Sequence, residues 1–167
     1  SCINSDLANN YGNLCQRVIS FNEKNFNLTV PEKIKLEKSD LELLNKFSDN
    51  VDLLRTYINN QELSLYASFI IDCLFQANKY FNDQEPWKKK SDILRLSTIV
   101  YVSLEVIRKV SLLLNPIIPD TSLKVLNIFN IKKEDINLES IKNHEFLEKK
   151  SKINKIGLLF RKIEKND

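Results

Sequence analysis

The sequence has few of the residues that form tight turns. Its 167 residues include only two glycines and four prolines. An all-β fold needs many turn residues, so this shortage argues against that class. A glycine-rich phosphate-binding loop is excluded as well, because Gly12 and Gly157 stand far apart. The abundance of leucine, isoleucine, lysine and glutamate favours a helical fold instead.

The sequence also lacks the patterns of a metal site or a nucleophilic catalyst. Cys2, Cys15 and Cys73 are scattered without a C-x-x-C pair, and the only histidine is His144 in a weakly patterned polar segment. Zinc sites need clustered ligands, and a Cys–His catalytic pair needs two adjacent side chains. We therefore expect no metal ion and no catalytic residue in this chain. The odd cysteine count is typical of free thiols in a reducing cytoplasm.

Length and charge narrow the class further. The length predicts one domain over residues 1–167, and no apolar run reaches the ~18 residues that a membrane span needs. A net charge of +3 is too small for a general nucleic-acid coat, so any nucleic-acid binding must be local. Because the sequence does not begin with methionine, we expect it to be a piece of a longer protein.

Apolar residues recur at spacings of three and four, which predicts an all-α bundle of about five main helices. The expected helices cover residues 5–25, 41–59, 62–81, 91–114 and 121–129. The helix over 91–114 is apolar on nearly all faces and should be central. Ser5 or Asn4 should cap the first helix and Ser39 or Asp40 the second, with Leu41 and Leu65 among the inward residues. Short helical turns are expected within 134–150, and a docked tail over 153–163.

Two polar features do not fit an ordinary helix surface. The outward face of the helix over 5–25 is rich in amides, where glutamate and lysine are usual; it carries Asn9, Asn13, Gln16, Arg17 and Ser20. Trp87, the only tryptophan, follows a proline that opens a new element and precedes Lys88, Lys89 and Lys90. A flat ring beside cations suits a stacked base next to a phosphate. The alternative is a core-capping tryptophan beside solvated lysines.

Three segments carry a family resemblance. Residues 4–18 read NSDLANNYGNLCQRV, residues 77–88 read ANKYFNDQEPWK, and residues 112–119 read LLLNPIIP. They are similar to the LANDLGNLVQR, ANRYIDEQAPW and LLxPxxP segments of bacterial methionyl-tRNA synthetases, which are class I enzymes. In order and separation the segments resemble the anticodon-binding helical domain of that family over nearly the whole chain. Asn10 replaces a usual aspartate, and residues 159–164 lack the proline of the family's LFPRIE segment.

The resemblance implies a function in tRNA recognition. It implies that Asn13, Arg17 and Trp87 bind the CAU anticodon of a methionine-accepting tRNA. The HIGH-type and KMSKS-type motifs are absent, so it places ATP, Mg²⁺ and catalysis in a separate catalytic domain of the same cytoplasmic protein. That protein would be a methionine–tRNA ligase without a membrane segment, and this fragment alone would not be catalytic.

The chemistry of these residue types agrees with that role. A stacking tryptophan contributes about 1–3 kcal/mol but tolerates any base. Asn13 and Arg17 lie four residues apart, on one helical face. Arginine carries only donors, which suit the O2 and N3 acceptors of cytosine and oppose the N3 donor of uracil. We therefore expect this pair to favour cytosine at the first anticodon position.

Several alternatives remain open. The first is the anticodon domain of a related class I synthetase, such as those for leucine, isoleucine, valine or cysteine, which would share the bundle but not the trio of Asn13, Arg17 and Trp87. A helical protein-interaction module is a third class, and it predicts an apolar surface groove in place of a polar face near Trp87. For single residues, the alternatives are a local polar contact for Asn13 and a surface ion pair for Arg17. Lys88, Lys89 and Lys90 are candidates for phosphate contacts, with a solvated charge run as the alternative.

Overall fold

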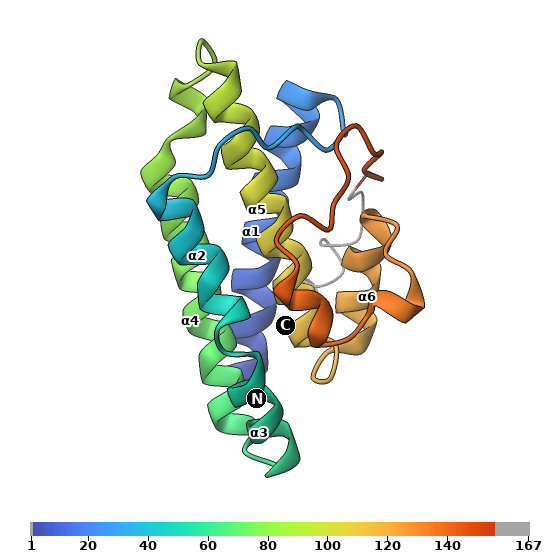
Figure 1. Ribbon diagram of the computed structural model, residues 1–167. Helices are drawn as coiled ribbons and strands as arrows, with labels where there is room; N and C mark the ends of the chain where they lie inside the picture. The colour runs from blue at the N-terminus through green and yellow to red at the C-terminus, as the bar shows by residue number, and fades with distance from the viewer. Residues whose placement is uncertain (1, 156–167) are drawn as a thin grey trace.

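The computed structural model describes residues 2–155, with side chains from residue 5 onward, and over this range the chain is an all-α bundle (Figure 1). The α-helices are α1 (Cys2–Phe26), α2 (Lys38–Ser48), α3 (Val51–Asn59), α4 (Leu63–Gln84), α5 (Ile93–Leu114) and α6 (Pro119–Ile128). Single turns of 3₁₀-helix form η1 (Pro86–Lys88), η2 (Lys133–Asp135) and η3 (Glu139–Lys142). The predicted all-α bundle is confirmed. Of the short turns expected within 134–150, η3 lies inside that range and η2 begins one residue before it.

The helix α5 lies at the centre of the bundle, as its apolar residues on all faces predict. Nearly every residue from Leu96 to Leu114 is buried. It packs against α1, α2, α4 and α6, with α2 and α6 on opposite sides of it (Figure 1). Burial on all faces explains why this helix lacks the polar stripe of a surface helix.

The single helix expected over residues 41–59 is wrong, because α2 and α3 are separate there. The Asn50 side-chain amide donates to the carbonyl oxygen of Lys46 at 2.7 Å. Asparagine and aspartate side chains compete for backbone groups and so favour helix ends, and Asp49 and Asn50 form the break. The turn lets α3 continue in a new direction, toward the tip that it forms with the start of α4 (Figure 1).

The first buried residue of α2 is charged: it is Asp40. Asp40, Leu43, Leu44 and Phe47 are the buried residues of this helix. Leu41 was expected to face inward, but it is exposed, because Asp40 occupies the inward position at that end. Asp40 is also not the N-cap: that position is Glu37, whose N–H donates to Asp40 Oδ2 at 2.9 Å. Ser39 lies inside the first turn.

Other expectations for single residues also need correction. The helix α1 already begins at Cys2, so neither Asn4 nor Ser5 is its N-cap. Leu65 is exposed and not part of the core, because the start of α4 projects beyond the bundle with α3 (Figure 1). The first part of the expected tail does dock: Ile153 is buried and donates its N–H to the Leu28 carbonyl at 2.8 Å. The rest of the tail, residues 156–167, lies outside the described residues.

A buried ionic cluster on α5 holds the segment that contains η3. The Glu105 carboxylate accepts from Arg108 Nη2 and from the Leu147 N–H, both at 2.8 Å. Lys109 Nζ donates to the Ile141 carbonyl at 2.6 Å, and the three charged side chains are 0–1% exposed. Burial lowers the pKa of Lys109 from its usual 10.5 to about 7, although the Glu105 carboxylate opposes this shift.

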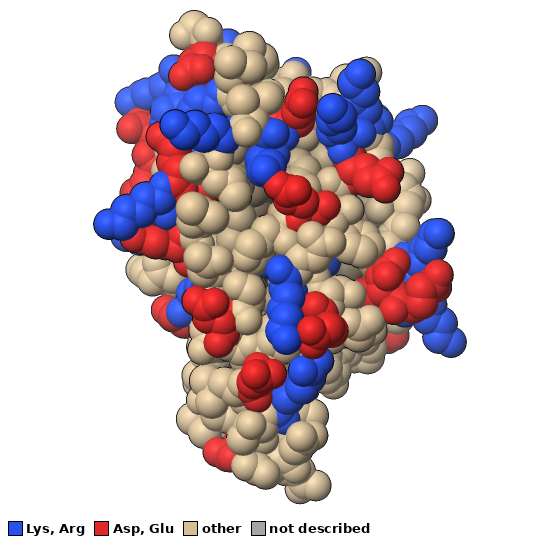
Figure 2. Space-filling view, in the orientation of Figure 1, with Lys and Arg blue, Asp and Glu red and all other residues tan. Residues whose placement is uncertain are grey.

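Charges of both signs are mixed on the surface. Figure 2 shows Lys and Arg beside Asp and Glu over the face in view. The ion pairs of the described residues include Lys46 with Asp72 at 2.5 Å and Arg55 with Glu139 at 2.7 Å. This face therefore offers no broad basic patch. Among residues 2–155, no helix is both long and apolar enough to cross a membrane.

Candidate nucleic-acid interface

The helices α1 and α4 pack side by side and bring Arg17 onto α4. Arg17 Nη1 donates to Asn78 Oδ1 at 3.3 Å, and Nη2 donates to Asn82 Oδ1. The guanidinium carbon lies 5.2 Å from the centroid of the Phe81 ring. In the described part of the chain Arg17 pairs with no carboxylate, so the surface ion pair considered above does not form. The amides fix its direction, and further guanidinium donors are left for a ligand.

Trp87 lies on η1, directly beyond the end of α4. Glu85 ends that helix in a left-handed conformation, with φ 47°, and Pro86 begins the 3₁₀ turn. The Trp87 side chain is 44% exposed, and its ring lies 6.2 Å from the ring of Phe81, centroid to centroid. Trp87 therefore rests on the core without being enclosed by it. Part of the ring is accessible to solvent, as stacking on a base requires.

The ring of Phe81 connects the two predicted site residues. Arg17 and Trp87 both contact this ring, and Phe21 packs against it edge to face at 6.0 Å. Our sequence analysis did not assign Phe81 a role. Phe81 lies one helical turn after Ala77, and both residues are buried in α4. This spacing was the signal in the sequence that Phe81 faces the core beneath the site.

A groove runs between α1 and α4 on the side of Arg17 away from Trp87. Its volume is about 430 Å³, and its lining includes Asn10, Asn13, Gln16, Arg17, Phe75 and Asn78. The two helices run in the same direction, because Asn13 shares this groove with Phe75 while Arg17 bonds Asn78 and Asn82. The third predicted residue, Asn13, therefore lies on the Phe75 side of Arg17. It is exposed, and among the described residues its side-chain amide has no hydrogen-bond partner.

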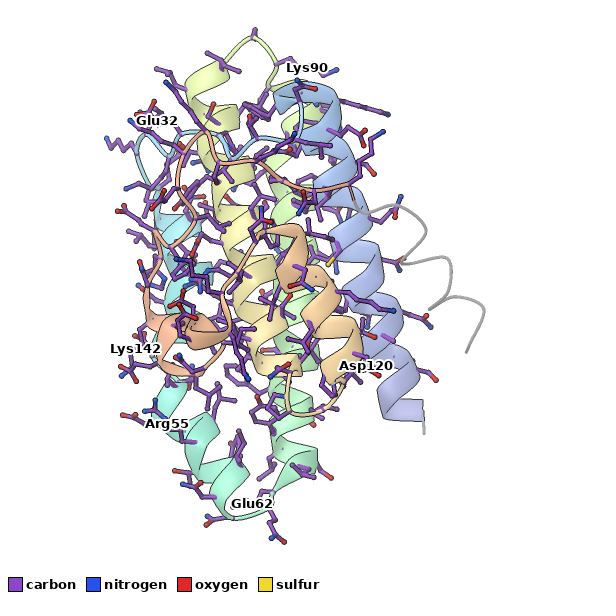
Figure 3. The ribbon with its side chains drawn as sticks, turned by 90° about the vertical axis from the view of Figure 1, so that its right-hand side faces the viewer. Glu32, Arg55, Glu62, Lys90, Asp120 and Lys142 are labelled. Carbon is purple, nitrogen blue, oxygen red and sulfur yellow. The ribbon has the colours of Figure 1, made fainter. Side chains whose placement is uncertain are left out.

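The three lysines after Trp87 are not equivalent. Lys88 Nζ pairs with Glu85 Oε2 at 2.7 Å, and this hydrogen bond raises the pKa of Lys88. Lys89 Nζ donates to the backbone carbonyl of Gln84 and is partly buried. Lys90 is exposed at the end of the bundle, and no carboxylate of the described residues pairs with it (Figure 3). Of the three candidates, Lys90 has the charge that is most available to a phosphate.

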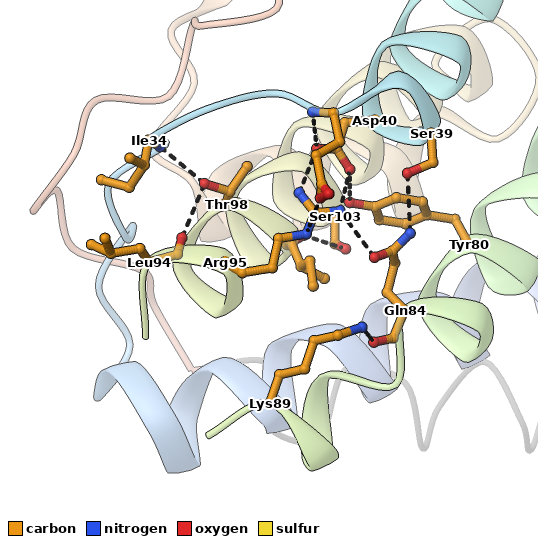
Figure 4. Close-up of polar contacts among 12 residues, drawn as sticks. Ile34, Ser39, Asp40, Tyr80, Gln84, Lys89, Leu94, Arg95, Thr98 and Ser103 are labelled. Carbon is orange, nitrogen blue, oxygen red and sulfur yellow. Dashed lines mark hydrogen bonds and ion pairs between the residues drawn. The ribbon is translucent and has the colours of Figure 1, made fainter. Parts of the chain in front are cut away.

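A polar network anchors the turn that carries Trp87 (Figure 4). The buried Asp40 carboxylate accepts from Arg95 at 2.7 and 3.0 Å and from the Tyr80 hydroxyl at 2.6 Å. Burial disfavours the Asp40 charge, but the hydrogen bonds from Arg95 and Tyr80 outweigh burial and lower the Asp40 pKa. Arg95 Nη2 also donates to Gln84 Oε1 at 2.9 Å, and Gln84 donates to Ser39 Oγ at 3.1 Å. The last residue of α4 is thereby tied to α2 and α5.

This network was not foreseen from the sequence. Asp40 was assigned a capping role and Arg95 none. A buried carboxylate and a guanidinium that lie far apart in the chain give no local signal, because their pairing depends on how three helices pack. The arrangement presents an exposed indole, a fixed guanidinium and free amides on one surface, which are groups that bind unpaired bases.

Comparison with known proteins agrees with this chemistry. A family model described as the anticodon binding domain of methionyl tRNA ligase matches residues 30–167. The methionine–tRNA ligase of Thermotoga maritima is 34% identical over 167 residues, which cover 99% of this chain and 26% of that protein. The methionine–tRNA ligase of Brucella suis is 36% identical over 129 residues, covering 77% of this chain and 25% of that protein. The chain thus spans about a quarter of the length of these relatives.

Solved structures show the same fold. The apo form of Mycobacterium tuberculosis methionyl-tRNA synthetase superposes with a TM-score of 0.86 at 29% identity, covering 95% of this chain and 32% of that chain. The same synthetase in complex with methionyl-adenylate gives the same TM-score. Family match, sequence relatives and fold point to one assignment. The chain belongs to the family of methionyl-tRNA ligase anticodon-binding domains.

Proposed function

We propose that this chain recognises the CAU anticodon of a methionine-accepting tRNA through Asn13, Arg17 and Trp87. The observation that carries the proposal is the shared contact of Arg17 and Trp87 with the ring of Phe81. Two side chains from segments 70 residues apart in the chain thereby form one surface of an exposed ring and a donor group. A base that leaves the anticodon loop can stack on the ring while its edge meets the donors.

The geometry supports cytosine as the base on Trp87. Arg17 is held by Asn78 and Asn82, so little side-chain freedom is lost when it binds a ligand. Its remaining N–H donors match the O2 and N3 acceptors of cytosine, whereas the N3 donor of uracil would leave an opposed donor. Such a mismatch costs about 1–3 kcal/mol, or about 5- to 150-fold in affinity. Lys90 is the lysine that best suits a phosphate of the loop.

The lining of the groove beside Arg17 favours RNA over a protein-interaction module. A module that binds an amphipathic helix would present an apolar groove. Here the lining is mixed: Ile71 and Phe75 are apolar, whereas Arg17 is charged and four residues carry side-chain amides, Asn10, Asn13, Gln16 and Asn78. Amides carry both a donor and an acceptor, as base edges do.

In the whole protein, this domain belongs to a cytoplasmic methionine–tRNA ligase. A separate catalytic domain of the same chain binds ATP and Mg²⁺ and joins methionine to the tRNA. The present chain contributes no catalytic residue to that reaction and holds the anticodon in place. The relatives named above, whose length is about four times that covered by this chain, support this division.

The proposal is tested by binding of hairpin RNAs that carry the anticodon loop. Trp87 is the only tryptophan, so quenching of its fluorescence reports stacking at this site. We expect quenching and tighter binding for CAU than for loops with a changed first base. Trp87→Ala should weaken binding about 5- to 150-fold with unchanged helicity, as loss of one stacked base predicts.

Two results would contradict the proposal. Equal affinity for all first bases would show that the site does not read cytosine. Loss of helicity in Trp87→Ala, with RNA affinity unchanged, would show that Trp87 serves only the core. Leu65→Ala is a matched control, because Leu65 is an exposed apolar residue of α4 at the other end of the bundle.

A further inference from the structure

Residues 139–147, called the latch below, are held on α5 mainly through their backbone. The latch begins with η3 and continues without helix or strand. Four side chains of α5 bind its main chain at distances from 2.6 to 3.1 Å: Tyr101, Glu105, Arg108 and Lys109. Only Ile141 and Leu147 of the latch are buried. A segment with so few buried apolar side chains can open locally while the rest of the fold stays intact.

The geometry around Lys109 suits a neutral amine. Arg108 already bonds both carboxylate oxygens of Glu105, at 2.8 and 3.3 Å, whereas Lys109 Nζ lies 3.8 Å from Glu105 Oε1. Lys109 donates two hydrogen bonds, to the carbonyls of Ile141 and Asn143, and a neutral amine has the two N–H groups that these need. A proton on Lys109 would add a buried charge that no further carboxylate compensates, and this costs free energy.

A second base, in the latch itself, is also held in its neutral form. His144 Nε2 lies 3.3 Å from Asn45 Oδ1 of α2, so Nε2 carries the ring proton when this oxygen accepts. Nδ1 is buried, and among the described residues it has no hydrogen-bond partner. A proton on Nδ1 would lack an acceptor and would add to the positive charge nearby. In agreement, burial lowers the pKa of His144, and the charge of Lys109 lowers it further.

The other charged groups near the latch keep their charge at neutral and mildly alkaline pH. They are Lys33, Asp49, Arg55, Glu139, Lys142 and Glu145. Arg55 and Lys142 both pair with Glu139, at 2.7 and 2.9 Å. Carboxylates, arginine and ordinary lysines stay almost fully charged between pH 7 and about pH 9. Burial raises the pKa of Tyr101, so its hydroxyl stays protonated. Lys109 is therefore the group around the latch whose charge can change in this interval.

We propose that the latch is a pH-sensitive device, which opens from α5 without unfolding of the helices and takes up protons on Lys109 and His144 when it opens. In the open form both side chains reach water and hold a proton at their ordinary affinity. A fall in pH therefore favours the open form. This inference does not depend on RNA binding, since Lys142 of the latch lies far from Lys90 at the end of the bundle (Figure 3).

Native-state hydrogen exchange, followed by mass spectrometry, tests the proposal. Latch amides, above all that of Leu147, should exchange faster than amides of α1 and α4. Low concentrations of urea should hardly change their exchange, because opening of the latch alone exposes little surface, whereas core amides should respond steeply. After correction for the intrinsic exchange rate, the opening constant should rise about 50-fold from pH 9 to pH 7, because burial lowers the pKa of Lys109 to about 7 from 10.5.

Three variants assign the protons. Lys109→Met should open more readily than wild type at pH 9, because two carbonyls lose their donor, and its opening constant should not change between pH 9 and pH 7. Lys79→Met is the matched control: Lys79 pairs with Asp83 on the surface of α4, so the rise of about 50-fold should remain. His144→Gln should keep that rise and lose the further rise that wild type shows below about pH 6.5.

The outcomes that contradict the proposal are distinct. If latch amides exchange at the rate of α1 and α4 amides and with their urea dependence, the latch opens only with the whole bundle. If the wild-type opening constant does not rise between pH 9 and pH 7, opening takes up no proton; this result needs no variant. An equal rise in wild type and Lys109→Met would show that the proton belongs to another group. An equal rise below about pH 6.5 in wild type and His144→Gln would remove the role of the histidine.

Discussion

The buried lysine of α5 should make folding stability depend on pH in a defined direction. Lys109 is fully buried, and burial lowers its pKa to about 7 in the folded chain, against 10.5 for an ordinary lysine. Between these two values the unfolded chain binds more protons than the folded one. Unfolding in this interval is therefore coupled to the uptake of a proton. The free energy of unfolding must then rise with pH, because proton uptake becomes less favourable as the proton concentration falls. Below the folded pKa both states are protonated and the dependence ends.

The magnitude follows from the width of that interval. One group that differs fully in protonation changes stability by roughly 1 kcal/mol per pH unit. From pH 7 to about pH 9, the gain is therefore about 2 kcal/mol. Buried Cys15 and Cys73 act in the opposite direction at the upper end, since burial raises their pKa values and the unfolded thiols ionise first. The comparison therefore needs a variant that keeps both thiols.

The assay is urea unfolding followed by circular dichroism, in wild type and in Lys109→Met. Methionine keeps an unbranched side chain and cannot titrate. It leaves the carbonyl of Ile141 without its lysine donor, which should lower stability by about 1–3 kcal/mol in addition to the pH-dependent difference. We expect the wild-type protein to gain about 2 kcal/mol on Lys109→Met between pH 7 and about pH 9. Parallel stability curves for the two proteins would refute the reasoning, because they would mean that Lys109 keeps an ordinary pKa.

Three further predictions concern the proposed RNA-binding surface and the network that anchors it. Arg17→Gln should lower the ratio of the affinities for cytosine and uracil at the first anticodon base by about 5- to 150-fold, measured with paired hairpins. An equal loss of affinity for every loop would indicate that Arg17 contacts only a phosphate. Arg95→Met should destabilise the chain by about 3–5 kcal/mol in urea unfolding, because it leaves the buried carboxylate of Asp40 uncompensated. Unchanged stability would mean that this pair contributes nothing net. Lys90→Gln should lower the slope of log affinity against log salt by about 0.7, whereas Lys88→Gln should change it less because Lys88 already pairs with Glu85. Equal slopes for both variants would remove the distinction between the two lysines.

Much of the fold was predictable because helical periodicity is a local property. The central place of α5 can be predicted from the sequence alone, since apolar residues occur on nearly all of its faces. The break between α2 and α3 was not predicted, because Asp49 and Asn50 interrupt a helix only where the packing of both halves gains from a turn. The inward stripe was misassigned at Leu41, since a sequence pattern gives no reason to bury Asp40 in its place.

The site was predictable in part and for a different reason. The family resemblance drew attention to Arg17 and Trp87, and the structure places both on one ring. The same resemblance gave no role to Phe75 or Phe81, because an isolated phenylalanine in a helical pattern is expected to be core. Whether such a ring supports a site or lines a groove depends on its exposure, which only the packed helices determine. The anchoring of the Trp87 turn through Arg95 could not be predicted from the sequence, because it depends on how α2, α4 and α5 pack together.

The ring of Phe81 has a consequence for how this surface can change. Because one side chain carries Arg17 on its face and Trp87 beside it, a change of size at position 81 displaces both groups together. Substitutions at positions 17 and 87 should then be non-additive, with a coupling energy that disappears once the shared support is truncated. Arg17 and Trp87, the two halves of the proposed recognition surface, share one support, so a redesign of either half should also alter the other.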